Sequence, residues 1–425
     1  MSSSTMEGTQ TPVVEAPTDK KFNREWIISL FGTAIGAGIL FLPINAGAGG
    51  IWPLALVTIL IAPMTYLSHR ALSRMICSAP SATDDITHVV RGYFGEGAGR
   101  LVTVLYFLAI YPIVLIYGVS ITNTIDSLMV NQLGMPSPPR WILSGVLIAL
   151  MMAVLLAGER IMLVVTGWLV YPLIAVLFGV TLYLIPSWKF DLFTQAGNGS
   201  IGEFLKTTWL MIPVMIFAFN HSPAISQFSL SQKKKYGRRS AEEASWILKR
   251  TTILLVLFAM SFVWSCVLAL GKGGLAEARA ANLPVLSYLA NVHNAPFISY
   301  LGPVVAILAI ASSFFGHYLG AAEGLAGIVR FVDPNGVKVP QRSLQIGVAI
   351  FMFLTTWIVA IINPSVLSLI ESLSGPVIAI VLYLLPMYAI HKVDALKEYR
   401  GRASNVFVTI AGIVAVAGIL TSLIS

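Results

Sequence analysis

Phe31-Gly-Thr-Ala-Ile-Gly-Ala-Gly-Ile-Leu-Phe-Leu-Pro43 is an apolar stretch that carries Gly36 and Gly38 at its middle and a proline shortly afterwards. Glycine loses the most backbone entropy in a helix and proline removes a backbone donor, so a helix opens easily here. A pair of small residues can instead serve as a close-packing surface between membrane helices. The stretch alone therefore leaves a broken helix and a tight helix contact as alternatives.

A second stretch favours the broken helix. Met211-Ile-Pro-Val-Met-Ile-Phe-Ala-Phe-Asn-His-Ser-Pro223 places three polar residues between two prolines. Unwound backbone within a bilayer is tolerated only around a cavity, where its amides and carbonyls find a ligand or water. Two breaks at similar depth therefore predict a binding site.

Composition places the chain in lipid. Of 425 residues, 56% are hydrophobic and 11% charged, and the mean hydropathy is +0.82. The net charge of +8 comes from basic residues between apolar runs, which argues against a nucleic-acid surface. Cys77 and Cys266 lie within or at the end of apolar runs, so neither a disulfide framework nor a thiolate metal site is predicted. No cofactor is expected.

Apolar runs suggest an all-α polytopic membrane protein. A hydrocarbon core of about 30 Å needs roughly 20 apolar residues per helix. Eleven runs qualify, over residues 25–46, 51–76, 100–127, 140–157, 161–186, 205–226, 250–271, 298–328, 343–362, 366–390 and 403–424.

The distribution of basic residues predicts the orientation. With the N-terminus inside, 22 of the 27 Lys and Arg fall in cytoplasmic segments. The five outside are Arg140, Lys189, Lys206, Lys272 and Arg279. The polar segment 1–24 is expected to be a disordered cytoplasmic tail without a cleavable signal peptide, and Ser425 is expected outside. The basic run 233–239 is either an orientation signal on a solvated loop or a site for anionic lipid. Residues 284–290 predict a short helix in the outer loop.

The two predicted breaks fall in the first and sixth runs, five runs apart. This spacing is expected if helices one to five and six to ten form two inverted repeats, residues 25–190 and 205–390, followed by an extra helix at 403–425. Half-helix N-termini attract a carboxylate, and half-helix C-termini attract an ammonium group or a metal cation. A small zwitterionic amino acid satisfies both. Its carboxylate is assigned to backbone at Ile35, Gly36, Ala37 and Gly38, and its ammonium group to carbonyls at Phe217, Ala218, Phe219 and Asn220.

Ionisable residues within membrane helices are candidates for function because they are costly there. His317 and Glu323 are candidates for proton handling, although Glu323 could instead snorkel toward Arg330 and His317 could be a neutral packing residue. Glu371 is a third candidate, or a capping partner of Ser368. The tyrosines at 106, 111 and 117 are secondary candidates for lining the pocket, with Tyr106 retained as a site residue.

The chain resembles the hydroxy and aromatic amino acid permease family, and within it the bacterial serine and threonine permeases, from Trp26 to the C-terminus. Four stretches carry the resemblance: Gly32-Thr-Ala-Ile-Gly-Ala-Gly-Ile-Leu-Phe-Leu-Pro-Ile-Asn-Ala-Gly47, Phe219-Asn-His-Ser-Pro223, Phe315-Gly-His-Tyr-Leu-Gly320 and Leu385-Pro-Met-Tyr-Ala-Ile390. The resemblance implies eleven spans, a LeuT-type core of two five-helix inverted repeats, and cation-coupled uptake of a small amino acid, usually with protons. It maps the family's broken helices onto residues 33–38 and 217–222, which adds Thr33, His221 and Ser222 to the site.

One position departs from the serine and threonine members, which have a lysine followed by a serine where this chain has Ser312 and Ser313. Two hydroxyls there resemble the sodium-coordinating pattern of related folds, so both H+ and Na+ coupling stay open.

The sequence thus predicts a symporter in the bacterial inner membrane that imports serine, threonine or a similar amino acid by alternating access. An aromatic amino acid permease of the same fold and a non-transporting amino acid sensor are the alternatives. No nucleophile with its base, and no pair of metal ligands at helical spacing, points to an enzyme.

Overall fold

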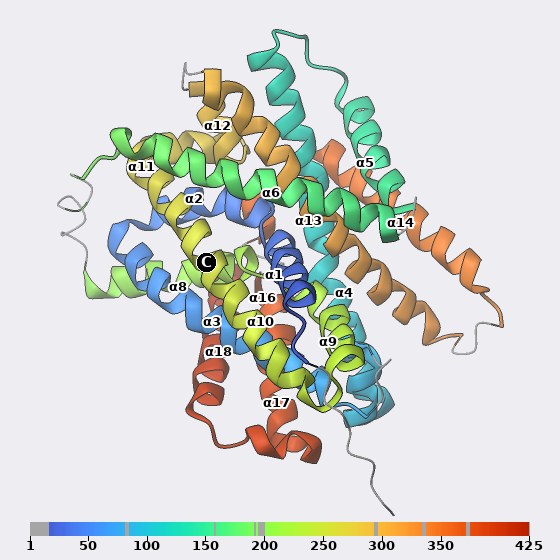
Figure 1. The fold of residues 1–425 in the computed structure, drawn as a ribbon. Helices are drawn as coiled ribbons and strands as arrows, with labels where there is room; N and C mark the ends of the chain where they lie inside the picture. The colour runs from blue at the N-terminus through green and yellow to red at the C-terminus, as the bar shows by residue number, and fades with distance from the viewer. Residues whose placement is uncertain are drawn as a thin grey trace, which may run out of the picture.

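The computed structural model describes residues 17–80, 85–156, 159–190, 193, 200–292, 296–333, 337–370 and 375–424, and regular structure in these ranges is helical throughout. Figure 1 shows the arrangement. The helices of the first half are α1 Lys20–Ala34, α2 Ala37–Gly49, α3 Ile51–Cys77, α4 Ile86–Ser127, η1 Leu128–Gln132, α5 Arg140–Leu156, α6 Glu159–Leu184 and η2 Ile185–Ser187.

The second half begins with the other interrupted helix. Its elements are α8 Ile201–Ala218, α9 Ser222–Tyr236, η4 Gly237–Arg239, α10 Ser240–Leu255, η5 Val256–Met260, α11 Ser261–Ala280, α12 Val285–Val292, α13 Pro296–Arg330, α14 Gln341–Ile362, α15 Val366–Leu369, α16 Gly375–Ala379, η7 Ile380–Leu384, α17 Leu385–Lys392, η8 Asp394–Tyr399 and α18 Ala403–Ile424.

The described helices are long and apolar enough for a multi-pass membrane protein. Seven meet the length and hydropathy expected of a span, the bent pair α1 and α2 makes an eighth, and three shorter apolar helices cover 140–156, 377–392 and 403–417. Each predicted run overlaps one of these helices. The all-α membrane architecture is therefore confirmed, whereas the count of eleven spans stays a prediction.

The distribution of side chains fits a lipid solvent. Large apolar side chains stand on the outside, among them Ile59 (72% exposed), Trp168 (78%) and Leu150 (61%). Polar side chains such as Ser120, Asn220 and Ser313 are instead buried. Lipid solvates the apolar exterior, whereas buried polar groups must find partners inside the bundle.

α13 and α4 form the most extensive helix pair, and α1, α6, α9 and α2 also pack on α13. α5 and α14 pack on each other at one side of the molecule, as Figure 1 shows. α12 lies at the opposite end of the molecule from α17 (Figure 1). The short helix predicted at 284–290 is confirmed as α12.

Two segments expected to lack structure are helical. α1 begins at Lys20, capped by the Asp19 carboxylate, so helix starts within the tail predicted for 1–24. The basic run 233–239 forms the last turn of α9 and η4, where a loop was expected. Lysines in the last turn of a helix complement its dipole, and Lys233 also donates to the Ala79 carbonyl after α3, at 2.6 Å.

Asp333 organises the turn after α13. Its carboxylate accepts backbone N–H groups of Val339 (2.7 Å), Val337 (3.0 Å) and Lys338 (3.1 Å), and Arg330 donates to it at 3.3 Å. The Val339 N–H first, and then the other donors, hold the pKa of Asp333 below its ordinary value. The carboxylate therefore contributes stability above about pH 4, and this contribution is lost as the pH falls through the lowered pKa.

Asp333→Asn should lower the melting temperature of the detergent-solubilised protein at pH 7, because the amide is a weaker acceptor than the carboxylate. The difference from the wild type should narrow as the pH falls below about 4 and through the lowered pKa of the wild-type carboxylate. Asp394→Asn is the matched control, because that side chain is 93% exposed. An equal difference at both pH values would contradict this account.

Candidate functional site

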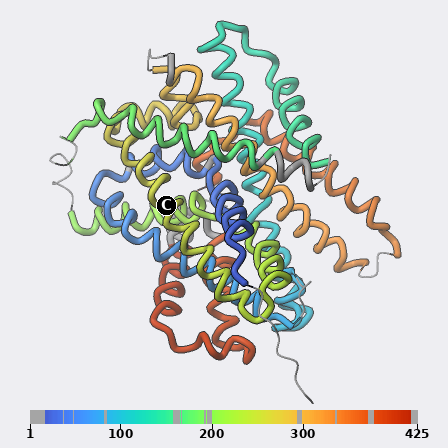
Figure 2. Tube along the Cα trace, in the orientation of Figure 1, coloured from blue at the N-terminus to red at the C-terminus, as the bar shows by residue number. Residues whose placement is uncertain are grey.

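The first break separates α1 from α2, whose axes differ by 52°; the change of direction is visible in Figure 2. Ile35 leaves helical geometry at φ −80° and ψ 98°, and Gly36 is extended at φ −146° and ψ −153°. The predicted opening is confirmed, and it falls at Ile35 and Gly36. Pro43 lies within α2. The first N–H groups of α2 and the last carbonyls of α1 have no hydrogen-bond partner within their own helices, and they face the break.

The second break spans residues 219–221, between α8 and α9. The Asn220 side-chain oxygen accepts the Ser222 N–H at 3.0 Å and so caps α9. Two of the four predicted carbonyls are already used, because the Phe217 oxygen accepts the Asn220 N–H at 3.2 Å and the Phe219 oxygen lies 3.1 Å from Nδ1 of His221. Of the four predicted carbonyls, those of Ala218 and Asn220 remain available to a cation.

The breaks meet in space. A Cβ atom added to Gly38 would lie 2.8 Å from the Ala218 Cα atom and 2.8 Å from the Phe217 ring. A Cβ atom on Gly36 would lie 2.5 Å from the Ser313 hydroxyl and 2.8 Å from that of Tyr117. Glycine is thus needed at both positions for close approach. The first turn of α2 contacts the end of α8, and the break contacts α13 and α4.

A chain of hydroxyl groups ends at the first break. The Ser313 hydroxyl donates to the Thr33 carbonyl at 2.9 Å and lies 2.6 Å from the Tyr117 hydroxyl. Since Ser313 has one proton to donate, the Tyr117 hydroxyl must donate to the Ser313 oxygen. A carbonyl and a hydroxyl oxygen side by side are ligands that Na+ or a proton carrier such as hydronium would use.

Three buried polar atoms near the second break have no hydrogen-bond partner among the described residues: Asn220 Nδ2, His221 Nε2 and the Tyr106 hydroxyl. A Cβ atom on Gly320 would lie 3.3 Å from both the Tyr106 hydroxyl and Pro223, which places Tyr106 beside the start of α9. Buried polar groups without partners are costly, so they suggest a ligand or a motion that satisfies them.

The other predicted coupling residues lie in different places. Ser312 donates to the Ala309 carbonyl of its own helix, so Ser313 is the one of the two hydroxyls that bonds to α1. Nδ1 of His317 lies 2.8 Å from the Ser313 carbonyl, and the His317 ring packs edge-on against Tyr117. Glu371 lies outside the described residues.

Glu323 hydrogen-bonds to the Asp85 carboxyl. Arg330, toward which Glu323 could alternatively have snorkelled, pairs with Asp333. Two carboxyl groups can bond only when one is protonated. Burial raises the pKa of Asp85, but hydrogen bonds from Thr87 and His88 outweigh this and lower it. Asp85 therefore favours its ionised form, and its charge disfavours a second negative charge on the neighbouring Glu323.

His69 of α3 belongs to this region and was not singled out from the sequence. Its imidazole stacks on that of His221 and accepts the His221 backbone N–H at 3.1 Å. The available signal was an ionisable residue inside an apolar run. Arg70 and Arg74, which follow His69, instead indicate the charged end of a helix.

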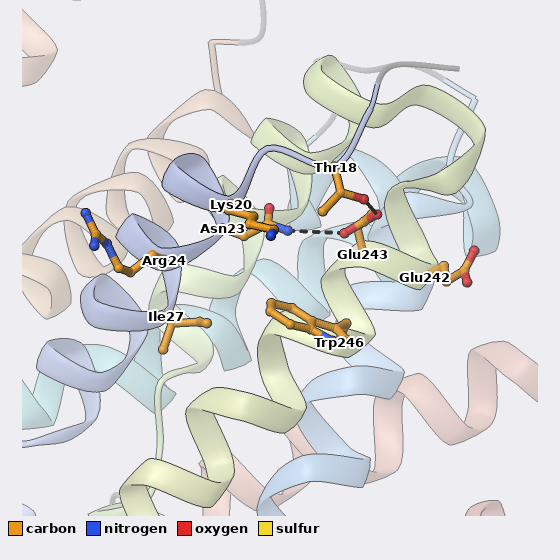
Figure 3. A pocket seen from close by; sticks show the side chains of 8 residues that line it. All are labelled: Thr18, Lys20, Asn23, Arg24, Ile27, Glu242, Glu243 and Trp246. Atoms are coloured by element: carbon orange, nitrogen blue, oxygen red, sulfur yellow. Dashed lines mark hydrogen bonds between the residues drawn. The ribbon is translucent and has the colours of Figure 1, made fainter. Parts of the chain in front are cut away.

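A second polar cluster, the Glu243 clasp, ties the start of α1 to α9 and α10. Glu243 accepts from Thr18 (2.7 Å), Asn23 (3.2 Å) and Arg239 (2.6 Å). Lys235 pairs with Asp19 at 2.9 Å. Beside the clasp is an open cavity of about 440 Å³, drawn in Figure 3. Its lining residue nearest the break, Ile27, is nine residues from Gly36, or roughly 13 Å along a helix. The cavity is thus separate from the breaks.

These features define a class of protein: a multi-pass membrane permease with two interrupted helices that meet within the bundle. The chain belongs to the tryptophan/tyrosine permease family, whose model matches residues 23–424.

Relatives in this family are named as transporters, and this chain is a transporter and not an enzyme. It is 47% identical to the serine transporter SdaC of Escherichia coli K12, over 99% of this chain and 100% of the relative. It is 40% identical to the threonine/serine transporter TdcC of Yersinia enterocolitica, over 97% of this chain and 98% of the relative.

Among solved structures, the chain shares its fold with a mutant form of a manganese transporter of Eremococcus coleocola. The TM-score is 0.62 at 16% sequence identity, over 96% of this chain and 89% of the other. At this identity the likeness concerns the fold alone.

Gly36→Val should reduce amino acid uptake by more than about tenfold while leaving membrane insertion intact. Its added carbon atoms would overlap the Ser313 and Tyr117 hydroxyls, and overpacking of this kind costs about 1–3 kcal/mol. The matched control is Gly347→Val on α14, because an added Cβ atom there meets nothing within 4 Å. Normal uptake by the Gly36 variant in proteoliposomes would count against the site.

Proposed function

We propose that this chain is a secondary active transporter that imports a small amino acid, serine or threonine, together with H+ or Na+ by alternating access. The observation that carries the proposal is the meeting of two interrupted helices at Gly36, Gly38 and Ala218. Broken backbone deep in a membrane bundle needs a partner, and a zwitterion offers complementary charges to both kinds of helix end. Relatives named as serine and threonine transporters support this substrate class.

The substrate carboxylate is assigned to the first N–H groups of α2, at Gly36, Ala37 and Gly38. Its ammonium group is assigned to the Ala218 and Asn220 carbonyls, since those of Phe217 and Phe219 already accept hydrogen bonds. Close packing around Gly36 and Gly38 favours a small side chain. The unpaired Asn220 amide and Tyr106 hydroxyl are suited to the substrate hydroxyl.

Two places are suited to the coupling cation. One is the Thr33 carbonyl with the Ser313 hydroxyl, which would be exposed to a cation if the bond between them opened. The other is Glu323, whose bond to Asp85 requires one proton. His317 lies between Ser313 and Glu323 in the sequence, and its ring contacts that of Tyr117. A proton taken up at Glu323 and a cation bound at Ser313 are the two coupling routes that this arrangement supports.

Alternating access needs one end of the pathway to open at a time. The Glu243 clasp joins α1 to α10, so its release would free α1 to pivot about the extended Ile35 and Gly36. Asn23 and Glu243 are buried but line an open cavity, so water could replace their partners if α1 moved away. The short α1 half is the natural moving part.

The proposed topology has eleven spans, a LeuT-type pair of inverted repeats over 25–190 and 205–390, and a final helix at 403–425. The distribution of Lys and Arg supports an inner-membrane protein with its N-terminus in the cytoplasm and its C-terminus in the periplasm.

Aromatic amino acids are the alternative substrate class, because the family is named for tryptophan and tyrosine permeases.

Radiolabelled serine uptake into proteoliposomes should be driven by a pH gradient or a Na+ gradient, each imposed separately. Unlabelled serine and threonine should compete, and tryptophan and tyrosine should not. Competition by the aromatic pair alone would exclude the serine assignment, and binding without accumulation under either gradient would exclude symport.

Glu323→Gln should impair gradient-driven serine accumulation at least about tenfold more than serine exchange. Glutamine keeps a hydrogen bond to Asp85 but carries no exchangeable charge, so binding survives and proton coupling is lost. Exposed Glu398→Gln is the control and should match the wild type in both assays. Equal losses of exchange and accumulation would contradict the role given to Glu323.

A further inference from the structure

Two buried imidazole rings lie face to face where α3 meets the second break. His69 and His221 have ring centroids 3.6 Å apart and planes inclined by 9°. His69 is 1% exposed and His221 is fully buried. The His221 backbone lies between α8 and α9, so the stack is attached directly to the unwound segment.

The hydrogen bonds fix the protonation state of His69 and place one proton on His221. Nε2 of His69 accepts the His221 backbone N–H at 3.1 Å, so it carries no proton. Nδ1 of His69 lies 2.8 Å from the Thr65 carbonyl, which can only accept, so Nδ1 carries the proton. By the same reasoning Nδ1 of His221 donates to the Phe219 carbonyl, and its Nε2 has no partner among the described residues. His69 is therefore neutral in this state, and His221 carries a proton on Nδ1.

Few titratable groups surround the pair within the described part of the chain. From α8 and α9 the group facing His69 is His221 itself. From η7 the Tyr383 hydroxyl contacts Ser68, the residue before His69. On α3 the neighbouring Arg70 stacks on Tyr66, and its guanidinium donates to the Tyr66 hydroxyl at 3.4 Å. No described carboxylate hydrogen-bonds either imidazole, so a protonated ring would have no counter-charge among the described residues that contact it.

We propose that His69 is a positioning residue for the substrate site, and that with His221 it forms a proton-sensitive lock on the break between α8 and α9. Neutral His69 holds the His221 N–H, and through it the adjoining Asn220 carbonyl and side chain. A protonated His69 has no free lone pair at Nε2 and loses this bond. The lock therefore opens when His69 takes up a proton.

The linkage runs in both directions. Protonation of His69 raises the equilibrium constant for opening the break. Opening the break raises the proton affinity of Nε2 by the same factor. Protonating His221 as well would stack two cations, so the pair takes up one proton. The part of this proposal that concerns substrate affinity rests on the proposed amino acid transport; the lock itself does not.

The test uses two substitutions of His69 in the purified full-length protein. His69→Gln keeps an acceptor near the position of Nε2 but does not titrate. His69→Phe keeps the ring stack but offers no acceptor. Exposed His391→Gln is the control. The dissociation constant for radiolabelled serine is measured for each protein at pH 7.5 and at about pH 4.5, because a buried ring without a counter-charge takes up a proton only below the ordinary histidine range. Each variant is expressed as a ratio to the wild type, so that any coupling common to all proteins cancels.

His69→Gln should bind serine within about twofold of the wild type at pH 7.5 and about tenfold more tightly than the wild type at about pH 4.5, where the wild-type lock opens. His69→Phe should bind about tenfold more weakly at pH 7.5. The control ratio should stay near one. A pH-independent ratio for His69→Gln, or wild-type binding by His69→Phe, would overturn the proposal.

Hydrogen exchange of the peptide covering residues 217–226, corrected for the intrinsic effect of pH, tests the lock without substrate. Acidification should raise exchange in the wild type and in His391→Gln but not in His69→Gln. An unchanged wild-type peptide would overturn the lock. If the wild type fails to bind serine while its exchange responds to acid through His69, the proposed substrate is wrong and the lock stands.

Discussion

Every backbone amide and carbonyl group inside a bilayer needs a partner, and this requirement governs the molecule. Continuous helices such as α3, α13 and α14 satisfy it internally. At Ile35–Gly36 and at residues 219–221 the chain gives up that pairing. The bundle compensates with side chains: Ser313 bonds the Thr33 carbonyl, Asn220 caps α9, and His69 accepts the His221 N–H. The groups left over are those available to a solute.

This arrangement explains why polar residues are concentrated where they are. Tyr117, Ser313 and His317 form one hydrogen-bonded set at the first break, and His69 with His221 forms another at the second. Both sets join a break to a continuous helix, α13 or α3. A continuous helix is a rigid support, so each break is held by a frame that does not itself unwind. The Glu243 clasp separately joins the start of α1 to α10.

The sequence predicted the membrane class, the apolar runs and both breaks, because runs of apolar residues and glycine–proline punctuation act locally. It did not distinguish Ser312 from Ser313, since only the helix rotation decides which hydroxyl bonds to α1. It also missed His69 and the Glu323–Asp85 bond, which join residues 152 and 238 positions apart. Such pairs follow from tertiary packing, whereas the sequence offered only the nearby Arg330 as an alternative neighbour for Glu323.

The central claim is that the two breaks hold a zwitterionic amino acid by backbone groups. An experimental map of the protein with serine bound would test it most directly. The account predicts a serine carboxylate within about 3 Å of the first N–H groups of α2, and its ammonium group at a similar distance from the Ala218 or Asn220 carbonyl. Serine bound elsewhere, or a helix running unbroken through Gly36, would contradict it.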